Sequence, residues 1–308
     1  MPLGSKRVVY AALVGNAATM VMKFVAAFVS GSSAMLAEAF HSVADTVNQA
    51  LMLVGIALSK KPPDEKHPFG YGMERYFWSF VVAISIFTIG ATFSIYEGVS
   101  KIRHPAPLVS VKLSYIVLGA ALLFEFITWV FAAREFARFK RGRGIWQTLQ
   151  DTRDPAVLTV LFEDSAALLG VTIAAAGIGL TVYTGNSLYD GIASIIIGVM
   201  LSVVAIFLSM ENRDLLLGES ASRRDRAGIR KVLRSFPDVE RVLELLTMHI
   251  APDEILLNVN IEFRDGMTTQ QIEQLIDDIE AAIRENMPQV RKIFIEADTP
   301  PGGSPNSV

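Results

Sequence analysis

The feature that most constrains this chain is a series of long apolar segments. A helix rises about 1.5 Å per residue, so roughly 20 apolar residues cross the hydrocarbon core of a bilayer. We predict six membrane-spanning helices, at about residues 8–29, 33–59, 77–99, 108–133, 155–183 and 188–210. The first two thirds of the chain therefore form a helical bundle in a lipid bilayer.

The composition fits a membrane protein with a smaller soluble part. Hydrophobic residues make up 51% of the 308 residues and charged residues 19%, and the formal net charge is -3. No basic face extends over a whole domain, so we expect no nucleic-acid partner. The chain has no cysteine, which excludes disulfides and thiolate metal sites. Histidines, carboxylates and amides remain as candidate metal ligands.

Charged connectors predict the orientation in the membrane. Lys and Arg are concentrated in residues 60–75 and 134–153, while the first and fifth connectors carry none. By the positive-inside bias, both termini and these two basic connectors face the cytoplasm, and the connector near Lys101 fits least well. Lys6 and Arg7 precede a long apolar run without a small-residue cleavage site. We therefore expect a retained first helix rather than a signal peptide.

The last ninety or so residues have the pattern of a soluble α/β domain. A helical stripe covers residues 229–236, and residues 255–263 alternate between apolar and polar as in a half-buried strand. Residues 239–250 and 290–295 supply two more strands, and Thr268 with Gln271 forms a capping box that begins a second helix. The predicted order is helix, strand, strand, helix, strand.

These patterns divide the chain into three parts. Residues 1–211 form the transmembrane domain, and residues 212–299 form a small two-layer domain of the ferredoxin-like kind, which we place in the cytoplasm. Residues 300–308 are rich in Pro, Gly and Ser, and we predict that they are disordered.

The second predicted span carries ionisable residues in an otherwise apolar run. His41 and Asp45 are four residues apart, so they lie on the same face of a helix. A charged residue at membrane depth costs roughly 2.5 to 3.5 kcal/mol by insertion measurements, and it normally faces a polar path or partner. A metal or proton site is our first hypothesis. The alternative is that the two side chains join helices through an interhelical hydrogen bond.

The fifth predicted span carries Glu163 and Asp164 at a similar depth. Together with His41 and Asp45 they would supply one imidazole and two or three carboxylates, a ligand set that suits a tetrahedral divalent cation such as Zn²⁺. Adjacent residues diverge by about 100° on a helix, so the two acidic side chains need not face the same point. Mn²⁺, Fe²⁺, Co²⁺ and Cd²⁺ also suit nitrogen and oxygen donors.

Proton exchange follows from the chemistry of these ligands. A cation binds neutral imidazole and ionised carboxylate, so its arrival displaces protons. Lys23, Glu38, Glu97 and Glu125 also lie within the spans and could form a proton path, although ion pairs or snorkelled ends explain them equally well. We hypothesise alternating access, in which the metal is bound midway through the membrane and protons from the far side release it.

The motifs, taken in order, resemble the cation diffusion facilitators, in the branch that contains zinc transporter nine. The resemblance rests on the Gly31-Ser32-Ser33 turn, residues 37–45, residues 67–72, Asp154-Pro155 and residues 189–194, followed by the small C-terminal domain. It implies an integral protein of the bacterial inner membrane that exports zinc or a related cation against protons. It also implies a homodimer joined through the C-terminal domain, and a ligand pair on each of the second and fifth helices.

The two ligand pairs match the family unequally. His41 and Asp45 correspond to the second-helix pair, whereas on the fifth helix Glu163 takes the first ligand position and Ala167 takes the second. Asp164 is the candidate substitute for the missing carboxylate. Ala167 also leaves open an alternative of another class, a non-transporting metal-sensing or partner subunit. An intramembrane enzyme is disfavoured, because no His-Glu-x-x-His helix or nucleophile–base pair is present.

Two further metal sites of the family are incomplete in this sequence. Asp64 and His67 match a secondary site in the second connector, but Tyr71 stands in place of the third ligand, which favours a structural role for this loop. In the C-terminal domain, the histidines frequent in the family correspond to Asn260 and Glu296. We therefore do not expect a dinuclear regulatory site there.

Overall fold

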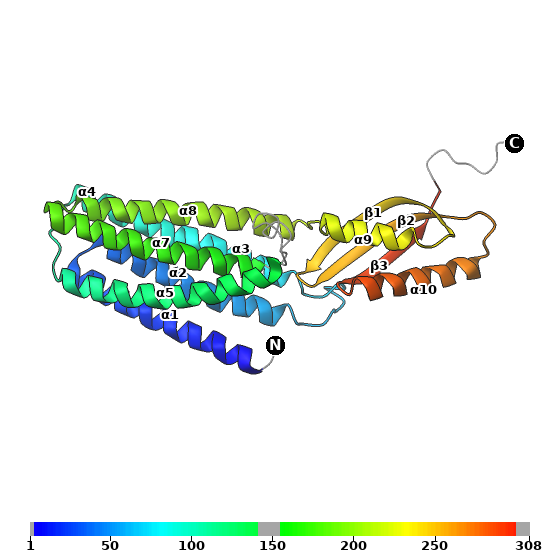
Figure 1. Ribbon diagram of the computed structural model, residues 1–308, viewed down its shortest axis with the longest axis horizontal. Helices are drawn as coiled ribbons and strands as arrows, with labels where there is room; N and C mark the ends of the chain where they lie inside the picture. Colours follow the sequence, from blue (N-terminus) through cyan, green and yellow to red (C-terminus); the bar gives the residue numbers. More distant parts are fainter. Residues whose placement is uncertain (1–2, 141–154, 300–308) are drawn as a thin grey trace. The chain divides into compact units, whose positions relative to one another are not determined.

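The computed structural model describes residues 3–140 and 155–299 of the chain. These residues form two compact units, whose helices and strands are labelled in Figure 1. Of the described residues, the first unit comprises 3–58, 74–140 and 155–213, and the second comprises 59–73 and 214–299. Residues 300–308, predicted to be disordered, and most of the basic connector at 134–153 lie outside the described residues.

The first unit is a bundle of long helices that run alongside one another (Figure 1). Its elements are α1 (Leu3–Ser30), α2 (Ser33–Leu58), α3 (Glu74–Ser85), the π-helical η1 (Ile86–Ala91), α4 (Thr92–Arg103), α5 (Val111–Lys140), α7 (Pro155–Thr184) and α8 (Leu188–Leu216). Gly31 and Gly185 follow α1 and α7 with φ of 66° and 68°. This left-handed conformation, which glycine adopts without strain, ends each helix and reverses the chain.

Four helical segments of the described residues are long and apolar enough to cross a membrane. They are Glu74–Arg103, Val111–Phe131, Thr159–Thr184 and Leu188–Leu216. The predicted spans at 8–29 and 33–59 correspond to α1 and α2, which are also helical. The α2 helix is less apolar because ionisable and amide side chains interrupt its hydrophobic run.

The third predicted span is one continuous helical segment with a π-helix in its middle. In η1 the turn is widened, and the Thr92 hydroxyl donates a hydrogen bond to the Phe87 carbonyl five residues earlier, at 3.1 Å. The Ser94 hydroxyl donates to the buried Gly90 carbonyl at 2.6 Å. The η1 segment packs against α2, and π-helical turns are frequent near functional sites.

A buried carboxylate joins the beginning of α2 to the beginning of α8. Asp190 is fully buried and accepts four hydrogen bonds, from the Ser32 hydroxyl (2.5 Å), the Ser33 N–H (2.7 Å), the Ser33 hydroxyl (3.0 Å) and the Ala34 N–H (3.3 Å). It therefore caps the N-terminus of α2 from a distant part of the chain. At the same turn the Lys101 ammonium donates to the Gly31 carbonyl at 2.6 Å.

The second unit contains a three-stranded sheet with two helices on one of its faces. Its elements are α9 (Arg223–Leu233), β1 (Val239–Ala251), β2 (Glu254–Phe263), α10 (Thr269–Asn286) and β3 (Val290–Ala297). The strand order is β1-β2-β3, antiparallel between β1 and β2 and parallel between β2 and β3. The predicted element order is confirmed. The described residues thus form a small α/β domain with a three-stranded mixed sheet.

The core of the second unit follows the predicted alternation. The inward side chains of β2 are at most 1% exposed at Ile255, Leu257, Val259 and Ile261. They pack against buried residues of α9 and α10. The predicted capping box at the start of α10 is confirmed, because the Thr268 hydroxyl accepts from the Gln271 N–H and the Gln271 side chain accepts from the Thr268 N–H.

The connector between α2 and α3 belongs to this second unit. The rings of Phe69 and Phe294 meet edge to face, with centroids 6.4 Å apart. Gly72 lies against the Ile250 backbone so closely that a Cβ at this position would collide with the Ile250 carbonyl oxygen. The loop is therefore packed onto the sheet that the C-terminal part of the chain forms.

Candidate metal centre

Three buried polar side chains follow one face of α2. His41, Asp45 and Asn48 are spaced by four and three residues, which places them one above another on a helix. Their exposed fractions are 1%, 9% and 0%. His41 Nδ1 lies 3.5 Å from Asp45 Oδ1, which is longer than an ordinary N–H···O hydrogen bond. The predicted pair therefore shares one buried location without a strong bond between its members.

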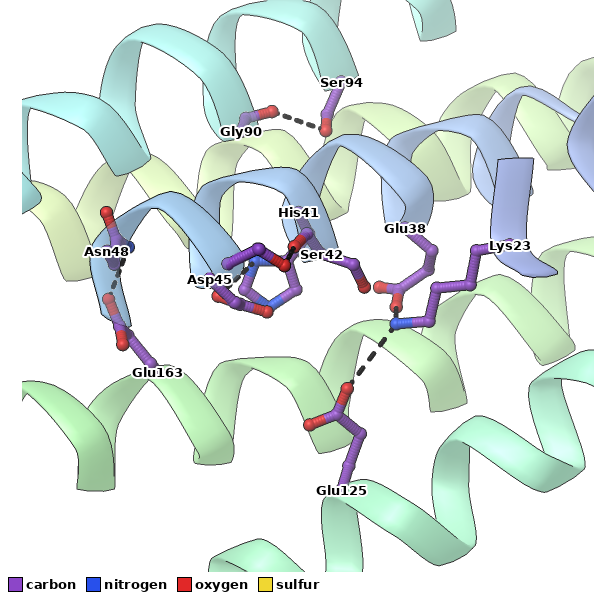
Figure 2. Close-up of polar contacts among 11 residues, drawn as sticks. Lys23, Glu38, His41, Ser42, Asp45, Asn48, Gly90, Ser94, Glu125 and Glu163 are labelled. Carbon is purple, nitrogen blue, oxygen red and sulfur yellow. Dashed lines mark hydrogen bonds and ion pairs between the residues drawn. The ribbon is translucent and has the colours of Figure 1, made fainter. Parts of the chain in front are cut away.

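The acidic residue of α7 that meets this face is Glu163, which is 6% exposed. The Asn48 side-chain amide donates a hydrogen bond to Glu163 Oε1 at 2.6 Å, as Figure 2 shows. This bond joins α2 to α7 across 115 positions of the sequence. Asn48 was not among the predicted ligands. Its position three residues after Asp45, on the same helical face, was the signal that could have identified it.

The other predicted position on α7, Asp164, lies to the side of this contact. It is half-buried, whereas Ala167 and Gly170 share the helical face of Glu163 and are buried. A Cβ on Gly170 would collide with Glu38 Oε1 of α2, which identifies this face as the one that meets α2. Asp164 is close enough to Glu125 of α5 for the two carboxylates to repel each other.

Several polar atoms on the α2 face are buried without a hydrogen-bond partner. They include both ring nitrogens of His41, Asp45 Oδ1 and Asn48 Oδ1. A buried polar group without a partner costs about 1–3 kcal/mol, and a bound water, a bound ion or a functional role accounts for such groups in folded proteins. Within residues 3–140 and 155–299, no three His, Asp or Glu side chains are arranged to hold a metal ion. The candidate ligands instead form two pairs, His41 with Asp45 and Asn48 with Glu163.

A second polar cluster joins α1, α2 and α5. The Lys23 ammonium, fully buried, lies 3.1 Å from Glu38 Oε2 and 3.6 Å from Glu125 Oε1 (Figure 2). The structure thus brings together three of the four residues of the predicted proton path. The fourth, Glu97 of α4, is half-buried and makes no ion pair with this cluster in the described part of the chain.

The two clusters influence each other electrostatically. Asp45 is within electrostatic range of the carboxylates of Glu163, Glu125 and Asp164, and of the Lys23 ammonium. Carboxylates gathered in a site of low dielectric constant repel one another, and Lys23 offsets only part of that repulsion. A bound cation or proton would relieve the remainder, so the arrangement suits an ion-binding function.

The loop residues Asp64 and His67 are more exposed, at 50% and 42% of their side-chain surface. Asp64 accepts hydrogen bonds from the Tyr71 hydroxyl at 2.6 Å and from the His67 N–H at 2.7 Å. These bonds hold the pKa of the Asp64 carboxyl below its ordinary value. Because the carboxylate and Tyr71 stabilise the turn itself, the geometry favours the structural role that we predicted for this loop.

The fold defines an integral membrane protein whose helical bundle buries a cluster of ionisable side chains. Residues 9–217 match the model of the cation efflux transmembrane domain, and residues 221–299 match that of the cation efflux protein cytoplasmic domain. The chain therefore belongs to the cation efflux family. This is a family of transporters and not of enzymes.

Similar proteins come from several kingdoms. The proton-coupled zinc antiporter SLC30A9 of Homo sapiens is 33% identical over 285 residues, which cover 90% of this chain and 50% of that protein. Metal tolerance protein C4 of Arabidopsis thaliana is 34% identical over 270 residues, covering 86% and 59%. The magnetosome protein MamB of Paramagnetospirillum magneticum is 23% identical over 304 residues, covering 97% and 96%. The chain thus spans about half the length of the human relative.

Proposed function

We propose that this chain exports a divalent cation, with Zn²⁺ as the first candidate, in exchange for protons. The observation that carries the proposal is the burial of His41, Asp45 and Glu163 on facing sides of α2 and α7, at most 9% exposed. Family membership and the antiporter name of the human relative add support. Mn²⁺, Fe²⁺, Co²⁺ and Cd²⁺ remain candidate cargoes, because the site offers nitrogen and oxygen donors without thiolate.

Exchange with protons follows from the same donors. Metal binding requires neutral imidazole and ionised carboxylates, so a cation that enters must displace the protons these groups carry. In the proposed cycle the site loads from the cytoplasm, the bundle rocks, and protons from the far side release the metal. The ion-paired cluster of Lys23, Glu38 and Glu125 lies beside this site and is the proposed route for protons.

The proposal includes a topology and an assembly. Six helices would span the inner membrane of a bacterial cell, with both termini in the cytoplasm. Support comes from the four apolar spans together with α1 and α2, and from the basic connectors at 60–75 and 134–153. The match to a cytoplasmic domain of cation efflux proteins at residues 221–299 supports a homodimer joined through this part of the chain.

Transport by purified protein in liposomes tests the function. A pH gradient should drive zinc uptake into the vesicles, detected with a fluorescent indicator inside them. His41→Ala and Asp45→Ala should each abolish this uptake, because each removes a buried donor of the site. His104→Ala, which alters an exposed histidine outside the site, is the matched control. Uptake at the wild-type rate in both site variants would remove the pair from the mechanism.

The buried Ala167 favours a second candidate function, because the face of α7 that meets α2 supplies only one carboxylate. On this reading the chain is a metal-sensing or partner subunit that binds a cation without moving it. Stoichiometric zinc binding by purified protein that shows no flux under any gradient would select this function over export.

A further inference from the structure

Asn48, which pairs with Glu163 in the candidate centre, has no role in the proposed function. It is fully buried, shares the α2 face of His41 and Asp45, and contacts Glu163 at 2.6 Å. Its carbonyl oxygen Oδ1 has no hydrogen-bond partner. We propose that Asn48, and not Asp164, supplies the fourth donor of the cation site, together with His41, Asp45 and Glu163. This inference rests on the proposed function.

The present hydrogen bond already directs the Asn48 amide at the carboxylate that would ligate the cation. In Figure 2 the amide nitrogen faces Glu163 and Oδ1 points away from it. An amide nitrogen cannot bind a metal, but the last torsion of asparagine is broad and roughly two-fold. Half a turn about that torsion would place Oδ1 beside Glu163 in place of the N–H donor. The oxygen, which has no hydrogen-bond partner, could then bind the cation.

The neighbouring positions on α7 offer no better donor. Ala167, on the Glu163 face, has no polar atom. Asp164 diverges from Glu163 by about 100° around the helix. It is half-buried, its Oδ2 also has no hydrogen-bond partner, and it lies within electrostatic range of Glu125 on α5 as well as of Asp45 and Glu163. Asn48 instead contacts Glu163 directly from the opposite helix, so an amide donor from α2 lies beside the α7 carboxylate.

The choice of donor changes the charge of the loaded site. Two carboxylates, a neutral imidazole and a neutral amide carry a charge of -2, which balances a divalent cation. A third carboxylate would leave the loaded site with a net negative charge in a medium of low dielectric constant, where an unbalanced charge is costly. The amide therefore permits binding without making release to the far side unfavourable.

The donor set also has a consequence for selectivity. One nitrogen and three oxygens form a harder set than two nitrogens and two oxygens, and harder sets accept Mn²⁺ and Co²⁺ more readily beside Zn²⁺. We expect Asn48→His to lower the transport of Mn²⁺ relative to that of Zn²⁺. This shift in preference would not result from a purely structural role of the residue.

Steady-state transport and metal titration of the full chain test the inference. Asn48→Ala should raise KM for Zn²⁺ and weaken calorimetric zinc binding, both by at least about 10- to 100-fold, which is the loss that removal of a hydrogen-bond partner of a metal ligand already causes. Asn48→Asp should lower KM and also lower kcat, because the added charge retains the metal. Gln49→Ala, which removes the neighbouring amide, is the matched control and should leave both unchanged.

The comparison with Asp164 decides the assignment. Asp164→Ala should change KM and zinc binding less than Asn48→Ala does, and an equal or larger change would overturn the inference. If Asn48→Ala keeps the wild-type KM and zinc affinity while His41→Ala abolishes transport, the inference about Asn48 is overturned. The proposed function is then left intact. If no variant transports, the calorimetric order of affinities still decides between the two residues. If Asn48→Ala does not fold, the KM and kcat of the Asn48→Asp variant provide the test. Wild-type values of both constants in Asn48→Asp would overturn the inference.

Discussion

Lys23 illustrates how a single charged residue is accommodated inside the bundle. Its ammonium is fully buried and lies between two carboxylates that approach from α2 and α5. Such a group is stable only while its partners remain, because an uncompensated buried charge costs far more than a pair contributes. The pairing also explains why Gly170 lies opposite Glu38, since any Cβ there would collide with the Glu38 carboxylate.

We predict that Lys23→Met destabilises the protein in detergent by about 3 to 5 kcal/mol, because it leaves Glu38 and Glu125 facing each other without their counter-charge. Denaturant unfolding, followed by tryptophan fluorescence, measures the loss. The double variant Lys23→Met/Glu38→Gln should recover part of it, since one of the two carboxylates is then neutral. Wild-type stability of Lys23→Met would show that the ion pairs contribute nothing.

The residues of the candidate site could be found from the sequence, but their partners could not. An ionisable residue in an apolar run is conspicuous, and helical spacing places His41 beside Asp45. The Asn48–Glu163 bond crosses 115 positions, and the Lys23–Glu38 pair joins two different helices. Which faces of α2 and α7 meet depends on how the whole bundle packs, so spacing within one helix cannot predict such contacts.

Close contact between helices depends in several places on glycine. On α8, a Cβ at Gly198 would lie 2.6 Å from the Ile95 side chain and 2.9 Å from the Ala91 carbonyl oxygen. The backbones of α4 and α8 therefore approach more closely here than any larger residue allows. Gly119 on α5 has no atom within 4 Å of the corresponding position.

These two glycines give a matched pair of variants. Gly198→Ala should destabilise the bundle by about 1–3 kcal/mol, because the added methyl group forces α4 and α8 apart. Gly119→Ala should be neutral or stabilising by up to about 1 kcal/mol, since alanine favours a helix and meets nothing there. Thermal unfolding in detergent measures both. An equal effect of the two substitutions would argue against the close contact.

At the level of elements, the hydrophobic pattern predicts where the helices and strands are, because burial and periodicity follow from local sequence. It does not predict the π-helical turn at Ile86–Ala91 or the capping of α2 by Asp190. The first depends on packing against α2, and the second on a carboxylate that lies 157 residues away. Both are consequences of tertiary structure.

In the whole molecule, the division into units does not follow the order of the chain. The connector at 59–73 is grouped with the C-terminal unit, although both neighbouring segments belong to the bundle. Its aromatic contact with β3 is the pair formed by Phe69 and Phe294, and aromatic pairs contribute about 0.5–1.5 kcal/mol beyond the area they bury.

We predict that Phe69→Ala loosens this connector without unfolding the sheet. Amide hydrogen exchange at Gly70, whose N–H donates to the His67 carbonyl at 2.9 Å, should become several-fold faster. Exchange at Leu257 and Val259 in β2 should keep the wild-type rate, which serves as the internal control. Unchanged exchange at Gly70 would mean that the aromatic pair does not fasten the loop.

The fastening of this connector bears on the bundle through the continuity of the chain. Its two ends continue directly into α2, which bears His41 and Asp45, and into α3, which leads to the π-helical turn. A single uninterrupted stretch of backbone therefore leads from the residues packed on β3 to the helix that carries the buried imidazole.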